Sequence, residues 1–343
     1  MNSPKTPSFS VVPGSQVRQV LHGDERQVTR VVEQAYRLHG AGRTVNPDSY
    51  FLRFPEDAAS RIIALPASAS GDVGVHGIKW ISSFPANVPV GLPRASAVLV
   101  LNDPDTGFPF ACLESSIISA ARTAASAALA AVTISSRRGA RARRVGFFGT
   151  GLIARYIHTY LRANGFEFDE LGVHDRSPEY AESFRGYLAR TESGVITVYE
   201  KPEELIRSAD LVVFATTAGV PHVTDPAWFQ HNPLVLHVSL RDLSPEVVLS
   251  ACNVTDDVEH CLKANTSLHL TEQRTGNRDF IAGDMPALLD GRIDCPVDRP
   301  VVFSPFGLGV LDLAVGKHVH GALAASGRLH TVPDFFSELD RYA

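Results

Sequence analysis

The sequence predicts an α/β protein in which a doubly wound parallel sheet is joined to a smaller, discontinuous α+β domain. Three observations lead to this fold class. Apolar strands alternate with helical segments between residues 144 and 260, which is the pattern of a parallel sheet with helices on both faces. Residues 49–114 instead give several β-like segments in succession, including a hairpin. Two helices rich in small residues, at 114–132 and 304–327, flank the alternating region.

The first domain begins with segments of different type. Residues 1–23 are expected to form a loose arm that leads into a short strand. A helix is expected over 24–42, because apolar residues recur at helical spacing and Gly40 and Gly42 stop it. Strands are expected at 49–54, 60–67 and 74–83, and a hairpin over 95–114 with a Pro-Asp-Thr-Gly turn.

The helix at 114–132 is nearly all small and apolar. Between Glu114 and Arg137 it carries one charged side chain, Arg122. A helix that is apolar on all sides is expected to be buried, so this guanidinium needs a specific reason to be there. A basic loop at 135–144 is expected to end the helix.

The alternating region is expected to form the second domain, residues 136–311. It opens with a strand, a glycine turn and a helix. Because segment 304–327 resembles the first small-residue helix, we expect it to return to the first domain, which is then residues 1–135 and 312–343. The expected elements are a strand–turn–helix unit at 144–165, strands at 168–177, 195–201, 210–219, 233–242 and 252–260, and helices at 180–194 and 202–209.

The composition excludes several classes of protein. The chain has 343 residues, of which 44% are hydrophobic, and a formal net charge of −5. This charge gives no general attraction to nucleic acid or an anionic membrane. An anion must therefore be bound locally, by a few specifically placed basic side chains. Residues 1–16 lack the pattern of a signal peptide, and no run reaches the ~18 apolar residues of a membrane helix. We expect a cytoplasmic protein.

The cysteines and histidines do not predict a metal site. The four cysteines fit no C-x-x-C spacing and are expected to be free thiols. His318 and His320 lack a third ligand at metal spacing and are expected to lie on an ordinary helix face. The cysteines are Cys112, Cys252, Cys261 and Cys295.

A dinucleotide fingerprint, G-x-G-x-x-A, begins at Gly149. Gly149 permits the tight turn, Gly151 lets the backbone approach a pyrophosphate, and Ala154 lets helix and strand close up. The next strand ends in Asp175, which is expected to accept hydrogen bonds from ribose hydroxyls and to favour NAD over NADP. The alternatives are a glycine turn without ligand and, for Asp175, a solvated strand end.

Further cofactor contacts are expected where strands end at the carboxyl edge of the sheet. Thr216 and Thr217 end one such strand and could contact the ribose or amide of nicotinamide, or could be ordinary turn residues. The expected cofactor-binding residues are Gly149, Thr150, Gly151, Leu152, Ile153, Asp175, Arg176, Thr216, Thr217, Ser239 and Thr123.

Four basic residues have apolar neighbours in the first domain, and each is a candidate for an anionic ligand. A buried cation without a partner is costly. The alternative is a salt bridge within the fold, for instance with Glu56, Glu114 or Asp103. Guanidinium groups suit carboxylates, whereas a desolvated ammonium loses pKa and can act as acid or base. The three arginines are Arg53, Arg94 and Arg122, and the lysine is Lys79.

Asp242 ends an apolar strand at the same edge as Thr216. With Lys79 from the first domain it is expected to make a proton-transfer pair. The alternative is a helix N-cap, although Ser244 before Pro245 is a better cap signal.

These stretches together resemble the ornithine cyclodeaminase/μ-crystallin family. The matching segments are "GIKWISSFP", "LNDPDTGFPFACLESSIISAARTAA", "GFFGTGLIAR", "SLRD" and "SPFGLGVLDLA". The resemblance implies a homodimer formed through the first domain, with a Rossmann domain for the cofactor. It also implies that Lys79 and Arg122 are active-site residues, that Asp242 is the catalytic acid/base, and that Arg53 holds substrate carboxylate.

Within the family the chain departs from ornithine cyclodeaminases, which carry a "GGDCPGKTEL" type segment where this chain has "VSLRDLSPEVV". It is more similar to the siderophore-pathway subgroup of the staphyloferrin B type. That subgroup oxidises N-(1-amino-1-carboxy-2-ethyl)-glutamate with NAD to L-2,3-diaminopropionate and 2-oxoglutarate. A substrate with three carboxylates would explain Arg53, Arg94 and Arg122 together.

The sequence leaves other functions open. The same fold could serve an ornithine cyclodeaminase, an alanine dehydrogenase or a ketimine reductase. A different class is a non-catalytic dinucleotide-binding protein, such as a crystallin-like or sensor member. The presence of both Lys79 and Asp242 argues against that class, because a binder has no use for a proton-transfer pair.

Overall fold

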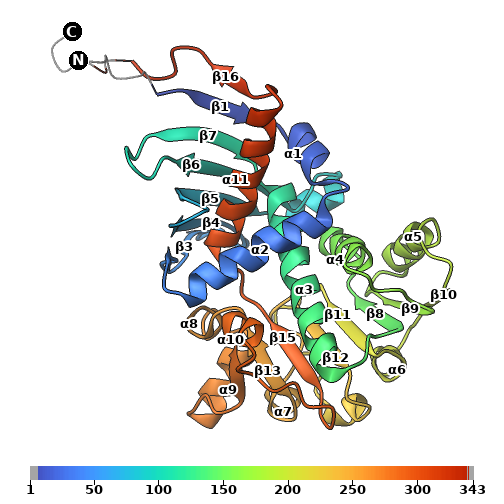
Figure 1. The fold of residues 1–343 in the computed structure, drawn as a ribbon. Coiled ribbons are helices and arrows are strands. Elements are labelled where there is room, and N and C mark those ends of the chain that lie inside the picture. The colour runs from blue at the N-terminus through green and yellow to red at the C-terminus, as the bar shows by residue number, and fades with distance from the viewer. Residues whose placement is uncertain (1–6, 338, 340–343) are drawn as a thin grey trace. The chain divides into compact units, whose positions relative to one another are not determined.

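The computed structural model describes residues 7–337 and 339. The chain forms two compact units, one made of residues 1–122 and 308–343 and the other of residues 123–307 (Figure 1). The first unit is therefore built from both ends of the chain.

The unit boundaries differ from those that the sequence suggests. The expected boundaries, after residue 135 and before residue 312, lie inside helices α3 (Ser116–Arg138) and α11 (Gly309–Ala325). The first division falls within α3, and the expected basic loop is helical as far as Arg138. A change in amino-acid composition along the sequence indicates a loop, so it cannot locate a boundary between two units that falls within a continuous helix.

The first unit contains an eight-stranded mixed sheet, which we call sheet A. The strand order is β16-β1-β7-β6-β5-β4-β2, with β3 beside β4. All neighbours are antiparallel except β1 and β7. The strands are β1 (Phe9–Val12), β2 (Thr44–Val45), β3 (Tyr50–Phe54), β4 (Asp57–Ala69), β5 (Val75–Ser83), β6 (Ala95–Asn102), β7 (Pro109–Glu114) and β16 (His330–Val332).

Helices cover one face of sheet A. α11 crosses β4, β5 and β6 and also contacts α2 (Glu25–Gly40) (Figure 1). The unit also has α1 (Gly14–Leu21) and a 3-10 helix, η1 (Pro85–Val90). The expected loose arm is thus partly wrong, because α1 buries Val17 and Leu21. The three apolar positions of this helix are too few to reveal helical periodicity.

The two faces of sheet A differ in burial. On β6, Leu99 and Leu101 are fully buried, whereas Val98, which directly precedes Leu99, is 42% exposed. Val98 pairs with Trp80 on β5, which is also 42% exposed. Because residues that pair directly share a face of the sheet, the face opposite the helices presents apolar side chains to solvent.

The second unit contains an eight-stranded sheet, sheet B, in which all pairs are parallel. The order begins β10-β9-β8-β11-β12, the 3-2-1-4-5 arrangement of a Rossmann sheet. The strands are β8 (Arg144–Phe148), β9 (Glu170–His174), β10 (Val195–Val198), β11 (Leu211–Phe214), β12 (Leu234–His237), β13 (Cys252–Thr255), β14 (Ile281–Asp284) and β15 (Val301–Ser304).

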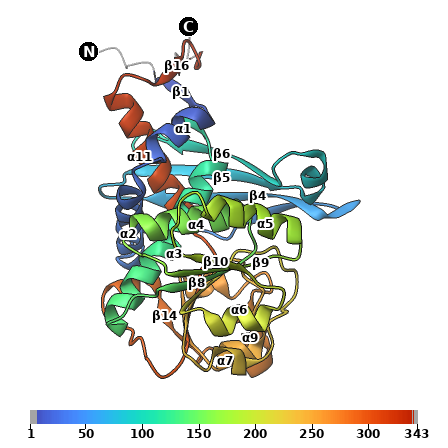
Figure 2. The ribbon, with the colours of Figure 1, turned by 90° about the vertical axis from the view of Figure 1, so that its right-hand side faces the viewer.

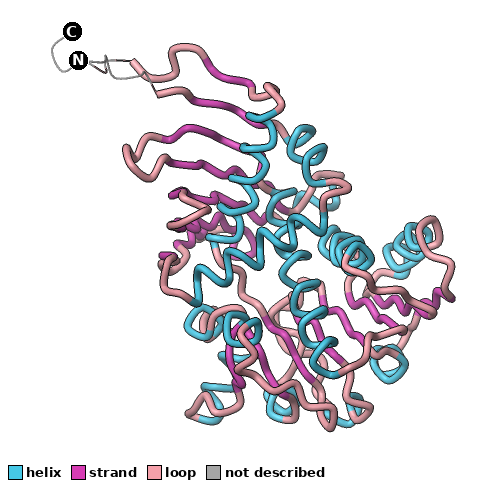
Figure 3. Tube along the Cα trace, in the orientation of Figure 1, coloured by secondary structure: helices cyan, strands magenta, loops and turns pink. Residues whose placement is uncertain are grey.

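Helices lie on both faces of sheet B. Figure 2 shows α4 and α5 on one side of β8 and β9, and α6 on the other. The strands of this sheet are short, whereas β4 and β5 in the middle of sheet A are long (Figure 3). The helices are α4 (Leu152–Ala163), α5 (Pro178–Leu188), α6 (Pro202–Ser208), α7 (Pro245–Leu249), α8 (Val258–Cys261), α9 (Ser267–Thr275), α10 (Met285–Leu289) and the 3-10 helix η2 (Pro226–Phe229).

Helix α3 is long and apolar enough, by length and composition, to cross a membrane. However, 67% of its most apolar 18-residue window is buried inside the protein. This burial is what a core helix shows, so α3 is explained by packing within the fold.

Candidate active site

The glycine turn between β8 and α4 has the backbone that the sequence predicts. Gly149 has φ +79°, and a Cβ built there would lie 2.6 Å from the carbonyl oxygen of Ala215. A side chain would therefore have to displace the backbone that follows β11. Phe148 pairs with Phe214 in the two adjacent strands, so this turn lies where the strand order reverses, the place at which α/β sheets bind ligands.

The surroundings of Gly151 differ from those of Gly149. It is the exposed N-cap of α4, and a Cβ built there meets no atom within 4 Å. The space in front of the helix is therefore open, and the first amide groups of the helix, at Leu152 and Ile153, have no partners within it. An open helix N-terminus of this kind binds the pyrophosphate of a dinucleotide. Buried Ala154 lets α4 pack on the sheet, so the residues present fit such a cofactor.

Asp175 follows β9 at the same edge of sheet B. Its Oδ2 accepts hydrogen bonds from the amide and the hydroxyl of Thr150 at 3.0 and 2.9 Å, and its Oδ1 accepts from the amide of Ser177 at 2.9 Å. The alternative of a merely solvated strand end is therefore wrong. A carboxylate has about four lone-pair sites, so Asp175 keeps capacity for ribose hydroxyls. Arg176 beside it is exposed.

Asp242 is fully buried in a cluster of polar side chains. Its Oδ1 accepts from the hydroxyl of Thr216 at 2.5 Å and lies 3.0 Å from Nε2 of His222. The hydroxyl of Ser239 donates to Oδ2. The amide of Asp242 donates to Nε2 of His237 at 3.1 Å, and Nδ1 of that ring contacts the hydroxyl of Ser304 at 3.0 Å, which fixes the turn after β12.

These contacts decide the charge of Asp242. Burial alone would raise its pKa, but the contacts of its carboxylate with His222, with the nearby ring of His237 and with the hydroxyl of Ser239 more than offset burial and hold the pKa well below its ordinary value. Asp242 is therefore a carboxylate at neutral pH. The side chain of His222 is 40% exposed, so it connects this buried charge with the surface.

The other predicted residues at this edge lie as follows. Asp242 does not cap a helix, because Ser244 is the N-cap of α7. Thr217 is exposed at the end of β11, and Thr123 is half-buried in α3. The cofactor contacts of all these residues remain predictions.

A second cluster, in the first unit, joins three ionisable side chains. Nζ of Lys79 on β5 lies 2.7 Å from Oδ2 of Asp312 on α11. Nε of Arg122 on α3 lies 3.4 Å from Oδ1 of the same carboxylate. Lys79 also donates to the hydroxyl of Ser119 at 3.3 Å. The alternative of a salt bridge within the fold therefore applies to Lys79 and Arg122, and the acid that pairs with both is Asp312 rather than Glu56, Glu114 or Asp103.

The cluster of Lys79, Arg122 and Asp312 has more positive than negative charge. Two cations share one fully buried carboxylate, and Lys79 is only 2% exposed. Burial lowers the pKa of Lys79 to about 8; Arg122 acts in the same direction, while Asp312 opposes it. Within the described residues, no hydrogen bond occupies the Nη atoms of Arg122. The guanidinium can therefore still bind a carboxylate through this end.

Glycines on two elements let Asp312 reach Lys79. A Cβ at Gly77 on β5 would lie 2.8 Å from Cδ2 of Leu313 on α11, and one at Gly316 on α11 would lie 2.2 Å from Cδ2 of Leu99 on β6. Both positions need glycine because α11 and the strands of sheet A approach closely here.

Arg53 and Arg94 lie elsewhere on sheet A. Arg53 is exposed on β3, with its guanidinium over the ring of Phe51 at 5.1 Å. The argument that it is a buried cation is therefore wrong. Arg94 is half-buried, and its Nη1 donates to the hydroxyl of Ser83 at 2.6 Å. Glu114, a suggested partner for such cations, instead accepts from the amide of Ser116 at the start of α3.

The sequence did not indicate three ionisable members of these clusters: Asp312, His222 and His237. Asp312 is the one acid in the apolar run from residue 304 to residue 316, which is the signal that singled out Arg122 in α3. His222 and His237 gave no comparable signal, because a histidine near a strand end is common.

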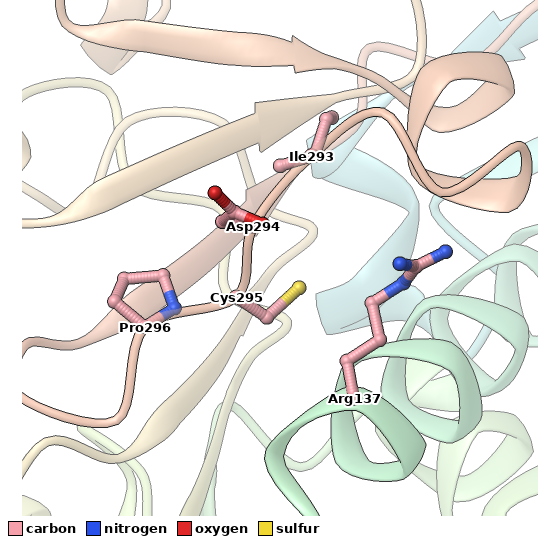
Figure 4. Close-up of a pocket in the computed structure, with 5 residues that line it drawn as sticks. All are labelled: Arg137, Ile293, Asp294, Cys295 and Pro296. Carbon is pink, nitrogen blue, oxygen red and sulfur yellow. The ribbon is translucent and has the colours of Figure 1, made fainter.

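A pocket of about 320 Å³ in the second unit lies apart from the predicted residues. Arg137, Ile293, Asp294, Cys295 and Pro296 line it (Figure 4). Nη2 of Arg137 donates to the carbonyl of Leu288 at 2.7 Å. This contact fixes the guanidinium within the fold, and we assign the pocket no role.

Comparison with known proteins agrees with the fold and the fingerprint. The model of the ornithine cyclodeaminase/mu-crystallin family matches residues 15–327. An archaeal alanine dehydrogenase, solved as a dimer with bound NAD, superposes with a TM-score of 0.83 at 24% identity, covering 96% of this chain and 100% of that chain. The predicted α/β fold class is confirmed.

Two relatives are similar in sequence to this chain over most of its length. The N-((2S)-2-amino-2-carboxyethyl)-L-glutamate dehydrogenase of Staphylococcus aureus (strain NCTC 8325 / PS 47) is 28% identical over 87% of this chain and 90% of its own length. The alanine dehydrogenase of Archaeoglobus fulgidus is 27% identical over 90% of this chain and 94% of its own length. The two similarities are nearly equal, so they do not select one substrate.

Proposed function

The chain belongs to the ornithine cyclodeaminase/mu-crystallin family, and from this premise we propose the reaction that it catalyses. It is an NAD-dependent oxidoreductase that acts on an amino acid or a derivative of one. We propose that its substrate is N-(1-amino-1-carboxy-2-ethyl)-glutamate and that its products are L-2,3-diaminopropionate and 2-oxoglutarate. The products would serve siderophore or peptide natural-product biosynthesis.

The observation that carries this proposal is the cluster of Lys79, Arg122 and Asp312. With Lys79 protonated its net charge is positive, and both cations are almost fully buried. An uncompensated buried charge is unfavourable, so the cluster is suited to a substrate that brings a carboxylate. Arg53 and Arg94 on the same sheet support a substrate with several carboxylates rather than one.

The cofactor NAD is assigned to the glycine turn. It supplies the hydride acceptor when bound. We assign the amides at the start of α4 to its pyrophosphate and Asp175 to its ribose hydroxyls. We further assign contacts with the remainder of the cofactor to Thr123, Thr216, Thr217 and Ser239.

We assign proton transfer to Lys79 and to Asp242 acting together with His222. The secondary amine of the substrate must be neutral before hydride leaves the adjacent carbon, and Lys79 with a pKa of about 8 is suited to take that proton. Arg122 fixes the carboxylate and so positions the reacting carbon. The oxidised substrate is an imine, and addition of water followed by C–N cleavage gives an amine and a 2-oxo acid.

Asp242 acts through its neighbour in this proposal. Because its carboxylate is fully buried and strongly acidic, it is a poor proton acceptor itself. Its Oδ1 instead lies 3.0 Å from Nε2 of His222, so that the carboxylate can orient the imidazole ring. We therefore propose that His222 exchanges the proton and that Asp242 holds the imidazole of His222 in position.

The test follows reduced cofactor by absorbance. Protein and NAD are incubated with the glutamate adduct, L-alanine, L-ornithine and L-proline in turn, and 2-oxoglutarate is assayed. We expect NADH and 2-oxoglutarate in equal amounts from the adduct. NADH from alanine alone would replace the proposal by an alanine dehydrogenase, and ammonia release without net NADH would indicate a cyclodeaminase. A bound nucleotide without turnover on any amine would indicate a non-catalytic binder.

We propose that the protein is a homodimer formed through the exposed face of sheet A. Leu52, Trp80 and Val98 lie on that face and are 47%, 42% and 42% exposed. Contiguous exposed apolar surface marks an interaction site, and the archaeal alanine dehydrogenase was solved as a dimer. The four free cysteines support a cytoplasmic location.

A further inference from the structure

Three arginines gather at one end of sheet A. Arg53 on β3 pairs directly with Arg61 on β4, and Arg61 pairs directly with Ser83 on β5. Arg94, just before β6, donates through Nη1 to the hydroxyl of Ser83 at 2.6 Å. Because paired residues of adjacent strands share a face, Arg53, Arg61 and Ser83 project on the same side. We call Arg53, Arg61 and Arg94 the arginine cluster.

The arginine cluster is electrostatically unfavourable without an anion. Like charges that pair directly across two strands repel each other. Burial and the charge of Arg61 both lower the pKa of Arg94. Within residues 7–337 and 339, no aspartate or glutamate forms an ion pair with any of the three.

The nearest acids in the sequence do not neutralise the arginine cluster. Asp57 accepts hydrogen bonds from the amides of Ala59 and Ser60 and so stabilises the turn between β3 and β4. Glu56 is exposed in the same turn. The sheet thus holds three guanidinium groups together without an internal counterion, which is the arrangement of an anion site.

The arginine cluster shares its face of sheet A with Lys79. Ser83 lies four residues after Lys79 on β5, and residues an even number apart point to the same side of a strand. Both residues are buried. At a rise of about 3.3 Å per residue, the two positions are roughly 13 Å apart along the strand. One face of the sheet therefore carries two separate cationic centres.

We propose that Arg53, Arg61 and Arg94 bind a second carboxylate of the substrate, while Arg122 binds the carboxylate next to the reacting carbon. This inference rests on the proposed function and deepens it, because it defines the substrate class as amines with at least two carboxylates. Arg61, which neither the motifs nor the burial pattern indicates, becomes a specificity residue. Monocarboxylic amino acids leave the arginine cluster unneutralised.

The test compares two 2-oxo acids of equal chain length. 2-Oxoglutarate has a distal carboxylate where 2-oxopentanoate has a methyl group, and both keep the carboxylate for Arg122. Their dissociation constants are measured by calorimetry on the full chain loaded with NADH. We expect the wild-type protein to bind 2-oxoglutarate at least about tenfold more tightly, and Arg61→Gln to lose this preference while its affinity for 2-oxopentanoate stays unchanged.

A control variant and a fold measurement accompany the test. Arg30→Gln removes an exposed arginine that is bonded to Gln27 within α2, and it must keep the preference for 2-oxoglutarate. Arg61→Gln relieves repulsion, so its thermal midpoint should not fall. A wild-type protein without the preference, or an Arg61→Gln variant that keeps it, overturns the inference. Absence of turnover on the glutamate adduct with the preference intact overturns the proposed substrate alone.

Discussion

At the scale of single residues, the protonation of Lys79 governs the pH dependence of catalysis. A base must be neutral, and the pKa of Lys79 is lowered from 10.5 to about 8. We therefore expect kcat/KM for amine oxidation to rise through pH 8 and to level off above it. Lys79→Arg keeps the charge but stays protonated at these pH values, so its residual activity should not rise near pH 8. An unchanged rise in this variant would remove Lys79 from the role of base.

Two glycines of the second unit, Gly151 and Gly186, are expected to differ in how their replacement by alanine affects NAD binding. At Gly151 a Cβ meets no protein atom but enters the space in front of α4. We expect Gly151→Ala to leave the thermal midpoint unchanged and to weaken NAD binding about tenfold, or about 1.4 kcal/mol. Gly186→Ala, in α5 and equally free of contacts, should leave NAD affinity unchanged and stabilise the fold by about 0.5–1 kcal/mol. Equal NAD affinities in the two variants would contradict the assigned pyrophosphate site.

Asp312 couples stability to the titration of Lys79. Asp312→Asn removes the shared counterion of two buried cations, so we expect a loss of about 3 kcal/mol in the free energy of unfolding. Because Asp312 raises the pKa of Lys79, the variant should also shift the rise in kcat/KM to a pH below 8. Urea denaturation and pH–rate profiles measure the two effects. Asp24→Asn, which removes the partly exposed partner of His318, serves as the control and should change neither by a comparable amount.

The candidate site was only partly predictable from residues. Lys79 and Arg122 stand out as charges among apolar neighbours, and the structure places both in one cluster. Their shared partner Asp312 carries the same signal but lies 190 residues from Arg122 in sequence, and nothing local pairs the two. His222 was missed because its role depends on its distance to Asp242, which only the fold sets.

At the scale of elements, the packing of α11 on sheet A determines where Asp312 lies. A Cβ at Gly316 would lie 2.2 Å from Leu99, whereas one at Gly321 in the same helix meets nothing within 4 Å. We expect Gly316→Ala to cost about 1–3 kcal/mol by overpacking and to lower kcat. Gly321→Ala should be neutral or slightly stabilising. Chemical denaturation and initial rates on both proteins measure this, and full activity in Gly316→Ala would contradict the role of the close contact.

Elements with strong periodicity were predictable, and short ones were not. The expected helix at 24–42 and the hairpin at 95–114 match α2 and the pair β6 and β7. In contrast, α1, β14 and the helices between residues 245 and 289 have at most nine residues. Such elements form because the surrounding sheet supplies contacts, and a few apolar positions leave no readable period.

At the scale of the whole molecule, dimer formation should depend on the exposed face of sheet A. We expect Trp80→Asp to shift the protein from dimer to monomer in size-exclusion chromatography with light scattering, because it places a charge in an apolar interface. Val195→Asp changes an equally apolar residue, 67% exposed on β10, and should leave the dimer intact. A Trp80→Asp protein that stays dimeric would move the interface to another surface.

The separation of Lys79 and Asp312 by 233 residues has a consequence for synthesis on the ribosome. Residues 123–307 form a contiguous unit and are complete before the segment that carries Asp312 has been translated. Until that segment emerges, the nascent chain has two cations but no counterion to bury with them. The first unit therefore completes its folding last, and a chain that stopped short of Gly309 would remain a target for chaperones and proteases.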